Sequence, residues 1–445
     1  MPVNCNFLTE EVYLNLRNVP EICLMERRNF VKKIAGGFTT SLLTLNSSDF
    51  LQHNKEKGSA DLSEADYWKN IRKKFPLKNH RFFFNNGTSG PVSYQVLDAI
   101  QNMMKDFSET GEYGSTAAAR EKIAQFINVK LSEISLTHNT TEGINIVAWG
   151  LPLKKGDEVI ITKQEHVGNA LPWLNRAKLD GIILKPFEPA STAQENIDLI
   201  NQYITSRTKV IALPHITCTT GQVLPIKEIS AIAQSKNIFT AIDGAQGAGS
   251  MDLDLKTLGC DFYSSSFHKW MLGPAGTGFL FVSEHLMDVL QAKWVGAHSD
   301  TGWDLQSDPP YLDGYVPTAH RYDYGSQSAA LFSGVEAAID LMQSIGMDKV
   351  EARVRELSGY LQQQLLELND KVEMLTPLEA ASRISMISFR PRKMDFLEFN
   401  KIAAQNGFRV RVVPESNQNC IRISTHIYNS FEEIDSFVKF TQEVL

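Results

Sequence analysis

The sequence is poor in cysteine, in excess positive charge and in long apolar runs, and each shortage excludes a class of protein. Its 445 residues include five cysteines, widely spaced, with no C-x-x-C pair of the kind that binds zinc. Neither a disulfide framework nor a metal site is therefore predicted. The net charge of −7 argues against a nucleic-acid partner, which needs a basic face. No apolar run approaches the roughly 20 residues of a membrane span, so none is predicted.

The composition that remains is that of an ordinary globular protein. Hydrophobic residues make up 43% of the chain and charged residues 21%, and the length suffices for two or three domains with large cores. Short β-branched runs recur, and each is separated from the next by a stretch long enough for a crossover helix. This alternation predicts an α/β fold with a large, mostly parallel, doubly wound sheet. The runs are Glu158–Thr162, Gly181–Lys185, Lys209–Leu213, Ile238–Asp243 and Thr277–Val282.

Residues 1–45 have the features of an export leader. Arg27 and Arg28 stand in the stretch MERRNFVKK, which resembles the twin-arginine motif, and a weakly apolar segment follows at 34–45. We therefore expect export by the twin-arginine route to the periplasm or another extracytoplasmic site. The alternative is a basic surface helix on a cytoplasmic protein.

The rest of the chain is predicted to form a linker and two domains. Residues 46–78 are polar and charged, as in a linker, although apolar positions over 63–75 have nearly helical spacing and predict a docking helix. A large domain is expected over 79–329, with its first segment packing on the small domain. A helical pattern followed by a few strands predicts a smaller α+β domain over 330–445.

Ligands of a parallel sheet bind at the carboxyl ends of its strands, so the residues that follow each apolar run are informative. The first such segment is His138–Gly143, in which Asn139 and Glu142 have the spacing of a capping box and predict a helix start. Thr140 and Thr141 place two hydroxyls beside the free N–H groups of that helix. This arrangement predicts either a phosphate cradle or an ordinary helix cap.

Two further segments carry charged residues at strand ends. Asp243 ends a buried strand, where a carboxylate is costly unless it meets a cation. A protonated pyridine nitrogen is such a partner, while a helix cap or a metal ligand are the alternatives. Lys269 lies beside the glycine-rich stretch 273–278 in an otherwise apolar setting, which should lower its pKa. A lysine of this kind suits covalent catalysis, and a surface loop lysine is the alternative.

Taken in order, the phosphate cradle, Asp243-x-x-Gln246 and Ser266-x-His268-Lys269 resemble the pyridoxal 5′-phosphate (PLP) enzymes of fold type I. More narrowly, the chain is similar to the class V aminotransferase group, which includes cysteine desulfurases, isopenicillin N epimerase-like proteins and kynureninase. The resemblance covers roughly residues 80 to 445. It implies PLP as cofactor, an amino acid as substrate, and a homodimer with shared active sites.

The resemblance implies a role for each matched residue around the cofactor ring. Lys269 matches the lysine that binds PLP covalently and then acts as the base at Cα. Asp243 matches the carboxylate that keeps the pyridine nitrogen protonated, and Gln246 matches the glutamine beside the phenolic oxygen. His166 matches the aromatic residue that stacks on the ring.

The resemblance also implies a phosphate-binding set. Thr140, Thr141, Ser266 and His268 match the residues that bind the phosphate from within one chain. Ser326 matches the hydroxyl that the partner subunit contributes to the same site.

The substrate residues follow from the same resemblance. Arg422 matches the arginine that grips the α-carboxylate, and Asn86 lies in a loop similar to the one that folds over substrate in epimerase-like members. Cysteine desulfurases carry a nucleophilic cysteine shortly before this arginine, but the stretch 409–419 has none and Cys420 belongs to the strand itself. We therefore expect an aminotransferase-type reaction first, an epimerase or racemase second, and a desulfurase or selenocysteine lyase last.

Two rival patterns are weaker. Ser266 and Lys269 also fit the S-x-x-K motif of penicillin-binding proteins, but no K-T-G or S-D-N element follows. The glycines at 244, 247 and 249 reverse the order of a dinucleotide-binding fingerprint. A non-enzymatic binding protein would have little reason to keep Lys269 together with Asp243.

Overall fold

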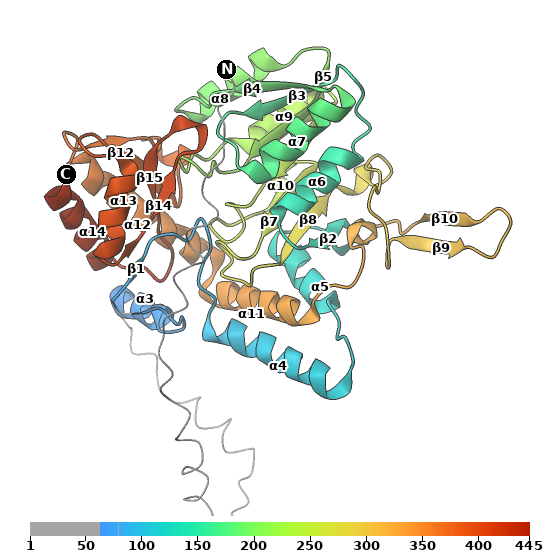
Figure 1. The fold of residues 1–445 in the computed structure, drawn as a ribbon, viewed down its shortest axis with the longest axis horizontal. Coiled ribbons are helices and arrows are strands. Elements are labelled where there is room, and N and C mark those ends of the chain that lie inside the picture. The colour runs from blue at the N-terminus through green and yellow to red at the C-terminus, as the bar shows by residue number, and fades with distance from the viewer. Residues whose placement is uncertain (1–62, 79) are drawn as a thin grey trace, which may run out of the picture. The chain divides into compact units, whose positions relative to one another are not determined.

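A seven-stranded sheet lies at the centre of the computed structural model, which describes residues 63–78 and 80–445. Its strand order is β2-β8-β7-β6-β5-β3-β4 (Figure 1). From β7 to β4 neighbouring strands run parallel, whereas β8 runs antiparallel to both β7 and β2. The predicted α/β architecture with a large, mostly parallel sheet is therefore confirmed. The strands span Ile134–Thr137 (β2), Glu158–Thr162 (β3), Ile183–Phe187 (β4), Thr208–Pro214 (β5), Phe239–Asp243 (β6), Phe262–Ser266 (β7) and Gly278–Val282 (β8).

Both faces of this sheet are buried under helices. Successive side chains of a strand point to opposite faces, and in β3 Ile160 enters one apolar cluster while Val159 and Ile161 enter another. All five residues of β3 are consequently buried. Strands covered on both faces read as continuous apolar runs, which is why most of them could be located from the sequence.

Many of the helices are capped at their N-termini by hydroxyl or amide side chains. At the start of α6, the Asn139 side chain accepts a hydrogen bond from the N–H of Glu142 at 3.0 Å, so the helix starts where the sequence predicts, while the Glu142 carboxylate bonds to His138 and does not complete the capping box. The helices around the large sheet are α4 (Tyr94–Thr110), α5 (Ala117–Phe126), α6 (Thr140–Gly150), α7 (Val167–Asp180), α8 (Ala193–Tyr203), α9 (Ile226–Ser235), α10 (Leu255–Leu258) and α11 (Ala329–Ile345). The 3₁₀ turns are η2 (Leu131–Glu133), η3 (Glu284–Leu286), η4 (Ala319–Tyr322), η5 (Ala380–Ser382) and η6 (Glu415–Asn417).

A second, antiparallel sheet of four strands forms near the C-terminus, in the order β11-β12-β15-β14. Its core is a separate apolar cluster that includes residues of the helices packed against it. The strands are Val372–Met374 (β11), Met386–Pro391 (β12), Arg411–Val413 (β14) and Cys420–Ser424 (β15), and the helices are Met347–Leu366 (α12), Phe396–Gln405 (α13) and Phe431–Val444 (α14).

Helix α12 joins the two cores. Val350 and Val354, near its start, pack in the core of the large sheet, whereas Leu357 and Leu361 pack in the core of the small sheet. Helix α11 lies beside α4 (Figure 1) and its buried side chains belong to the large side. The change of core thus falls within α12, after the boundary predicted near residue 330.

The segment before the large sheet contacts both cores, with Trp68 in the core of the large sheet and Phe84 in that of the small one. Strand β1 (Phe82–Phe83) pairs in parallel with β13 (Phe408–Arg409). Helix α3 (Glu64–Arg72) lies in the stretch for which a docking helix is predicted and buries Trp68. Residues 63–78 are therefore packed chain rather than the linker predicted over 46–78, whose earlier part lies outside the described residues, as does the predicted leader at 1–45.

A two-stranded hairpin projects from the large side (Figure 1). It consists of β9 (Asp300–Asp304) and β10 (Tyr311–Tyr315), and its exposed side chains include Trp303 and Leu312. In the part of the chain that the structure describes, no helix combines the length and apolarity needed to cross a bilayer.

Candidate active site

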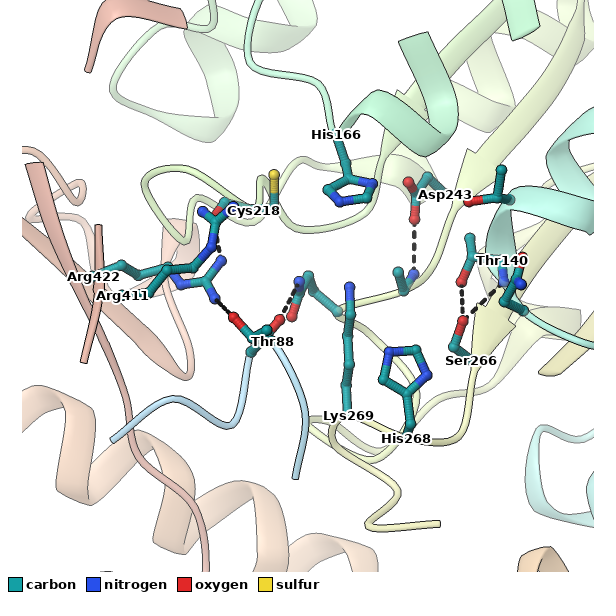
Figure 2. A pocket seen from close by; sticks show the side chains of 15 residues that line it. Thr88, Thr140, His166, Cys218, Asp243, Ser266, His268, Lys269, Arg411 and Arg422 are labelled. Atoms are coloured by element: carbon teal, nitrogen blue, oxygen red, sulfur yellow. Dashed lines mark hydrogen bonds between the residues drawn. The ribbon is translucent and has the colours of Figure 1, made fainter. Parts of the chain in front are cut away.

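A cavity of about 300 Å³ opens where the carboxyl ends of the parallel strands meet the small sheet (Figure 2). Most of the residues predicted from the sequence line it. They are Thr140, Thr141, His166, Asp243, Gln246, Ser266, His268, Lys269 and Arg422. The other lining residues are Gly87, Thr88, Asn139, Cys218, Ala245 and Arg411.

One end of the cavity is suited to an anion. The backbone N–H of Thr140 donates to Ser266 Oγ at 2.8 Å, and the two hydroxyl oxygens lie 2.7 Å apart. These groups stand at the N-terminus of α6, where the helix dipole favours negative charge. His268 Nδ1 is buried without a hydrogen-bond partner among the described residues, and burial lowers the pKa of His268 to about 4. A phosphate bound here would supply a partner for His268 Nδ1 and an acceptor for a hydroxyl of the Thr140–Ser266 pair.

Asp243 is a buried carboxylate at the end of β6. Its side chain is 5% exposed, and Oδ1 accepts a hydrogen bond from the N–H of Ala245 at 2.9 Å. Among the described residues it forms no ion pair within 4.0 Å. A buried carboxylate in this state favours a cationic ligand group, such as a protonated ring nitrogen.

Lys269 follows β7 and its amine faces the cavity (Figure 2). Burial lowers its pKa, which increases the share of neutral amine. The backbone around it is fixed by the loop after β1, where the Gly90 N–H donates to the carbonyl of His268 at 2.7 Å. A Cβ at position 90 would lie 2.5 Å from the carbonyl oxygen of Lys269, so only glycine allows this approach.

His166 and Gln246 are both held by hydrogen bonds to their neighbours. His166 Nδ1 accepts from the N–H of Gly168 at 3.0 Å at the start of α7, and burial lowers the pKa of this imidazole, with Lys269 adding to the effect. Gln246 Oε1 accepts from Trp270 Nε1 at 2.6 Å, while its Nε2 donates to the Gly87 carbonyl at 3.0 Å. Both side chains thus face the cavity in defined orientations.

Arg422 lies on β15 at the other end of the cavity (Figure 2) and is 1% exposed. Its Nη1 donates to the Cys218 carbonyl at 2.5 Å and its Nη2 to Thr88 Oγ1 at 3.0 Å. Its Nε is buried and has no partner among the described residues. Burial, and then the neighbouring Arg411, lower its pKa to about 10. A buried guanidinium without a carboxylate partner is suited to bind an anion such as a substrate carboxylate.

Two predicted residues lie outside the cavity lining. Asn86 is buried, accepts a hydrogen bond from Tyr428 Oη at 3.0 Å, and donates weakly to the Lys269 carbonyl at 3.4 Å. It therefore supports the lysine backbone, and its predicted contact with substrate stays a prediction. Ser326 is exposed on the large side, so its predicted place in a partner's phosphate site stays a prediction.

No sequence motif predicts a role in the cavity for Thr88 or Arg411. Thr88 stands in the glycine-rich loop 85–91, whose proximity to Arg422 depends on a contact between distant segments. Arg411 faces the cavity because it pairs with Arg422 across β14 and β15. The sequence shows the arginines at 409, 411 and 422. The register of β14 and β15, which decides which of them face the cavity, cannot be read from it.

The fold and the site together define a PLP-dependent enzyme of fold type I, and its cofactor is pyridoxal 5′-phosphate. The anion cradle, Asp243 and Lys269 fit the phosphate, the ring nitrogen and the aldehyde of that cofactor. A family model described as aminotransferase class-V matches residues 81–437. The chain belongs to this family.

Relatives and solved structures agree with this assignment. A probable cysteine desulfurase of Halalkalibacterium halodurans is 30% identical, with 83% of this chain and 96% of the relative covered. An isopenicillin N epimerase of Amycolatopsis lactamdurans is 26% identical, covering 85% and 99%. The solved cystine C–S lyase C-DES, in complex with its product cysteine persulfide, is similar with a TM-score of 0.76 and 26% identity, covering 82% of this chain and 98% of that one.

Proposed function

We propose that this protein is a PLP-dependent aminotransferase that acts at Cα of an amino acid. The observation that carries the proposal is a buried lysine amine of lowered pKa in the same cavity as a buried guanidinium without a carboxylate partner. The first group suits proton transfer at Cα, and the second suits the α-carboxylate beside it.

Each residue has a separate task in this proposal. PLP, when bound, withdraws electrons from Cα of the substrate. Arg422 binds the α-carboxylate and orients Cα, and the Lys269 amine takes the proton from Cα and returns it within the cavity. Asp243 holds a proton on the ring nitrogen, and His166 restricts the ring to one plane. Because Lys269 can both remove and return the proton, a single base suffices for transamination.

The names of the relatives favour a second candidate, a cysteine desulfurase or C–S lyase. Against desulfuration stands the segment 414–419, which precedes Arg422 and contains no cysteine. Cys420 lies buried on β15, where burial raises its pKa to about 12, which is unsuitable for a nucleophilic thiolate. We therefore rank transamination above desulfuration.

Epimerisation is supported by a different residue. Cys218 lines the cavity, and burial raises the pKa of its thiol to about 11. A neutral thiol can donate a proton, so Cys218 is a candidate for the second acid that a two-base epimerase requires.

The test is a panel of L-amino acids incubated with the holoenzyme and a 2-oxo acid acceptor. Our proposal predicts a new amino acid from the acceptor, with matching 2-oxo acid and no sulfide. Lys269→Ala is the control and should abolish turnover. D-amino acid without 2-oxo acid, lost in Cys218→Ala, would establish the epimerase instead. Sulfide or pyruvate from cysteine or cystine would establish the lyase.

We also propose a homodimer in which Ser326 completes the phosphate site of the partner subunit. Two features support it, namely the exposed position of Ser326 and the exposed apolar side chains of the neighbouring β9–β10 hairpin. Sedimentation should give twice the chain mass, and Ser326→Ala should weaken PLP binding. A monomer with unchanged PLP affinity would contradict the proposal.

A further inference from the structure

Two arginines face the same cavity from directly opposite positions of the small sheet. Arg411 on β14 and Arg422 on β15 are register partners in an antiparallel pair, so their side chains leave the sheet on one face with Cβ atoms about 5 Å apart. Like charges in this arrangement repel each other. The pair is therefore favourable only where anions lie close to it.

The two guanidinium groups differ in their partners. Arg422 makes contacts only to a carbonyl and a hydroxyl, and among the described residues no carboxylate lies within ion-pair distance of it. Arg411 forms an ion pair with Glu415, in which both of its Nη atoms contact the carboxylate. Glu415 is not among the residues that line the cavity, and its side chain is 27% exposed.

The phosphate of the cofactor does not account for this second cation. Thr140 and Ser266 form the anion cradle on the side of the cavity away from the two arginines (Figure 2). Arg422 accounts for one α-carboxylate. Neither of these two anions accounts for Arg411. Its two Nη atoms are already oriented by Glu415 to bind a carboxylate.

We propose that Arg411 binds a second carboxylate, on the side chain of the substrate, and that Glu415 is the internal counterion which this carboxylate displaces. The inference rests on the proposed function and names its substrate class, amino acids with an acidic side chain. In the absence of substrate Glu415 neutralises Arg411. In its presence the ligand carboxylate takes over the same guanidinium nitrogens, and Glu415 turns to solvent.

The test uses the PLP-loaded protein and carboxylates that cannot react. Calorimetry should show glutarate and succinate binding about 10- to 100-fold more tightly than propionate. Arg411→Gln should remove most of this preference and change propionate binding by less than about threefold. Arg411→Lys, which keeps the charge without the fork, should retain part of it. Glu415→Gln should tighten glutarate binding, since the competing carboxylate is gone.

Arg409→Gln is the matched control, because Arg409 is exposed and does not line the cavity. This variant should prefer glutarate over propionate as strongly as the wild type does. Equal binding of glutarate and propionate by the wild type would overturn the inference. So would an equal loss of both ligands in Arg411→Gln, which would mean that the two arginines share one carboxylate. If the dicarboxylate preference holds while no amino acid is turned over, the proposed reaction fails and the ligand class stands.

Discussion

The carbonyl oxygen of Cys218 accepts a hydrogen bond of 2.5 Å from Arg422 Nη1, which joins the segment after β5 to strand β15 of the small sheet. The guanidinium thus reaches into the cavity from one core while the lysine and the aspartate stand on the other. If Arg422 binds the α-carboxylate as proposed, amino-acid binding requires both sheets to be in place. We therefore expect residues of α12, which packs in both cores, to influence substrate binding from outside the cavity.

Replacing Arg422 by alanine should weaken amino-acid binding. The variant loses a charged hydrogen-bond donor to the α-carboxylate, which corresponds to about 2–4 kcal/mol, or a rise in KM of roughly one to three orders of magnitude. Arg422→Lys should recover only part of the loss because it lacks the planar fork. Steady-state kinetics of the three proteins measures this. A wild-type KM in Arg422→Ala would show that the α-carboxylate binds elsewhere.

Replacing Asp243 by asparagine should impair the chemistry more than the fold. The amide keeps the shape and an acceptor for the Ala245 N–H but removes the charge that holds a proton on the ring nitrogen. We expect kcat to fall by about two to three orders of magnitude, as when other electrostatic contacts of active sites are removed. Asp243→Glu should keep more activity than Asp243→Asn. Turnover of the asparagine variant at the wild-type rate would contradict this role.

Buried histidines should make the protein less stable in mild acid. His426 is fully buried, with Nδ1 accepting from the Ile427 N–H at 2.7 Å and Nε2 lying 2.8 Å from the Trp270 carbonyl. Burial lowers its pKa to about 4. The unfolded chain binds the proton near pH 6.5, so this contribution is fully present above that pH and is lost as the pH falls towards 4.

In His426→Gln, the fall of the unfolding temperature between pH 7 and pH 5 should therefore be smaller than in wild type. The exposed His285→Gln serves as control and should leave the dependence unchanged. Thermal unfolding followed by circular dichroism at both pH values provides the comparison. Parallel curves for wild type and His426→Gln would mean that His426 takes up no proton on unfolding in this range.

We propose that residues 1–45 direct export by the twin-arginine route, a proposal that concerns residues outside the described part of the chain. That route carries folded, cofactor-loaded proteins, so it suits an enzyme that acquires PLP in the cytosol. Replacing Arg27 and Arg28 by lysine should leave active holoenzyme in the cytosol, as measured by fractionation and PLP absorbance. Wild-type protein found in the cytosol with residues 25–45 intact would refute the proposal.

The catalytic end of the site could be predicted from the sequence because it depends on local order. Asp243 directly follows an apolar strand, and in a parallel sheet such ends meet at one edge. The cap of α6 at Asn139 is equally local. Strand β7 is absent from the predicted apolar runs, although Lys269 is predicted at a strand end, since Phe262–Ser266 includes three serines and lacks the β-branched character of its neighbours.

The substrate end could not be derived in the same way because it depends on pairing between distant segments. Arg411 enters the cavity through its register with Arg422, and a shift of one residue would turn it to the other face. The hydrogen bonds of Asn86 with Tyr428 and with the Lys269 carbonyl likewise join segments that are far apart in the sequence. The packing of α3 residues such as Trp68 also depends on apolar side chains from distant segments of the chain.

The central claim is that Lys269 carries the cofactor, and one measurement tests it directly. The protein is purified with PLP, reduced with borohydride, digested, and analysed by mass spectrometry. We predict a pyridoxyl group on Lys269, with loss of the absorbance near 400 nm on reduction and no modified peptide in Lys269→Ala. A pyridoxyl group on a different lysine, or none in a protein saturated with PLP, would contradict the account.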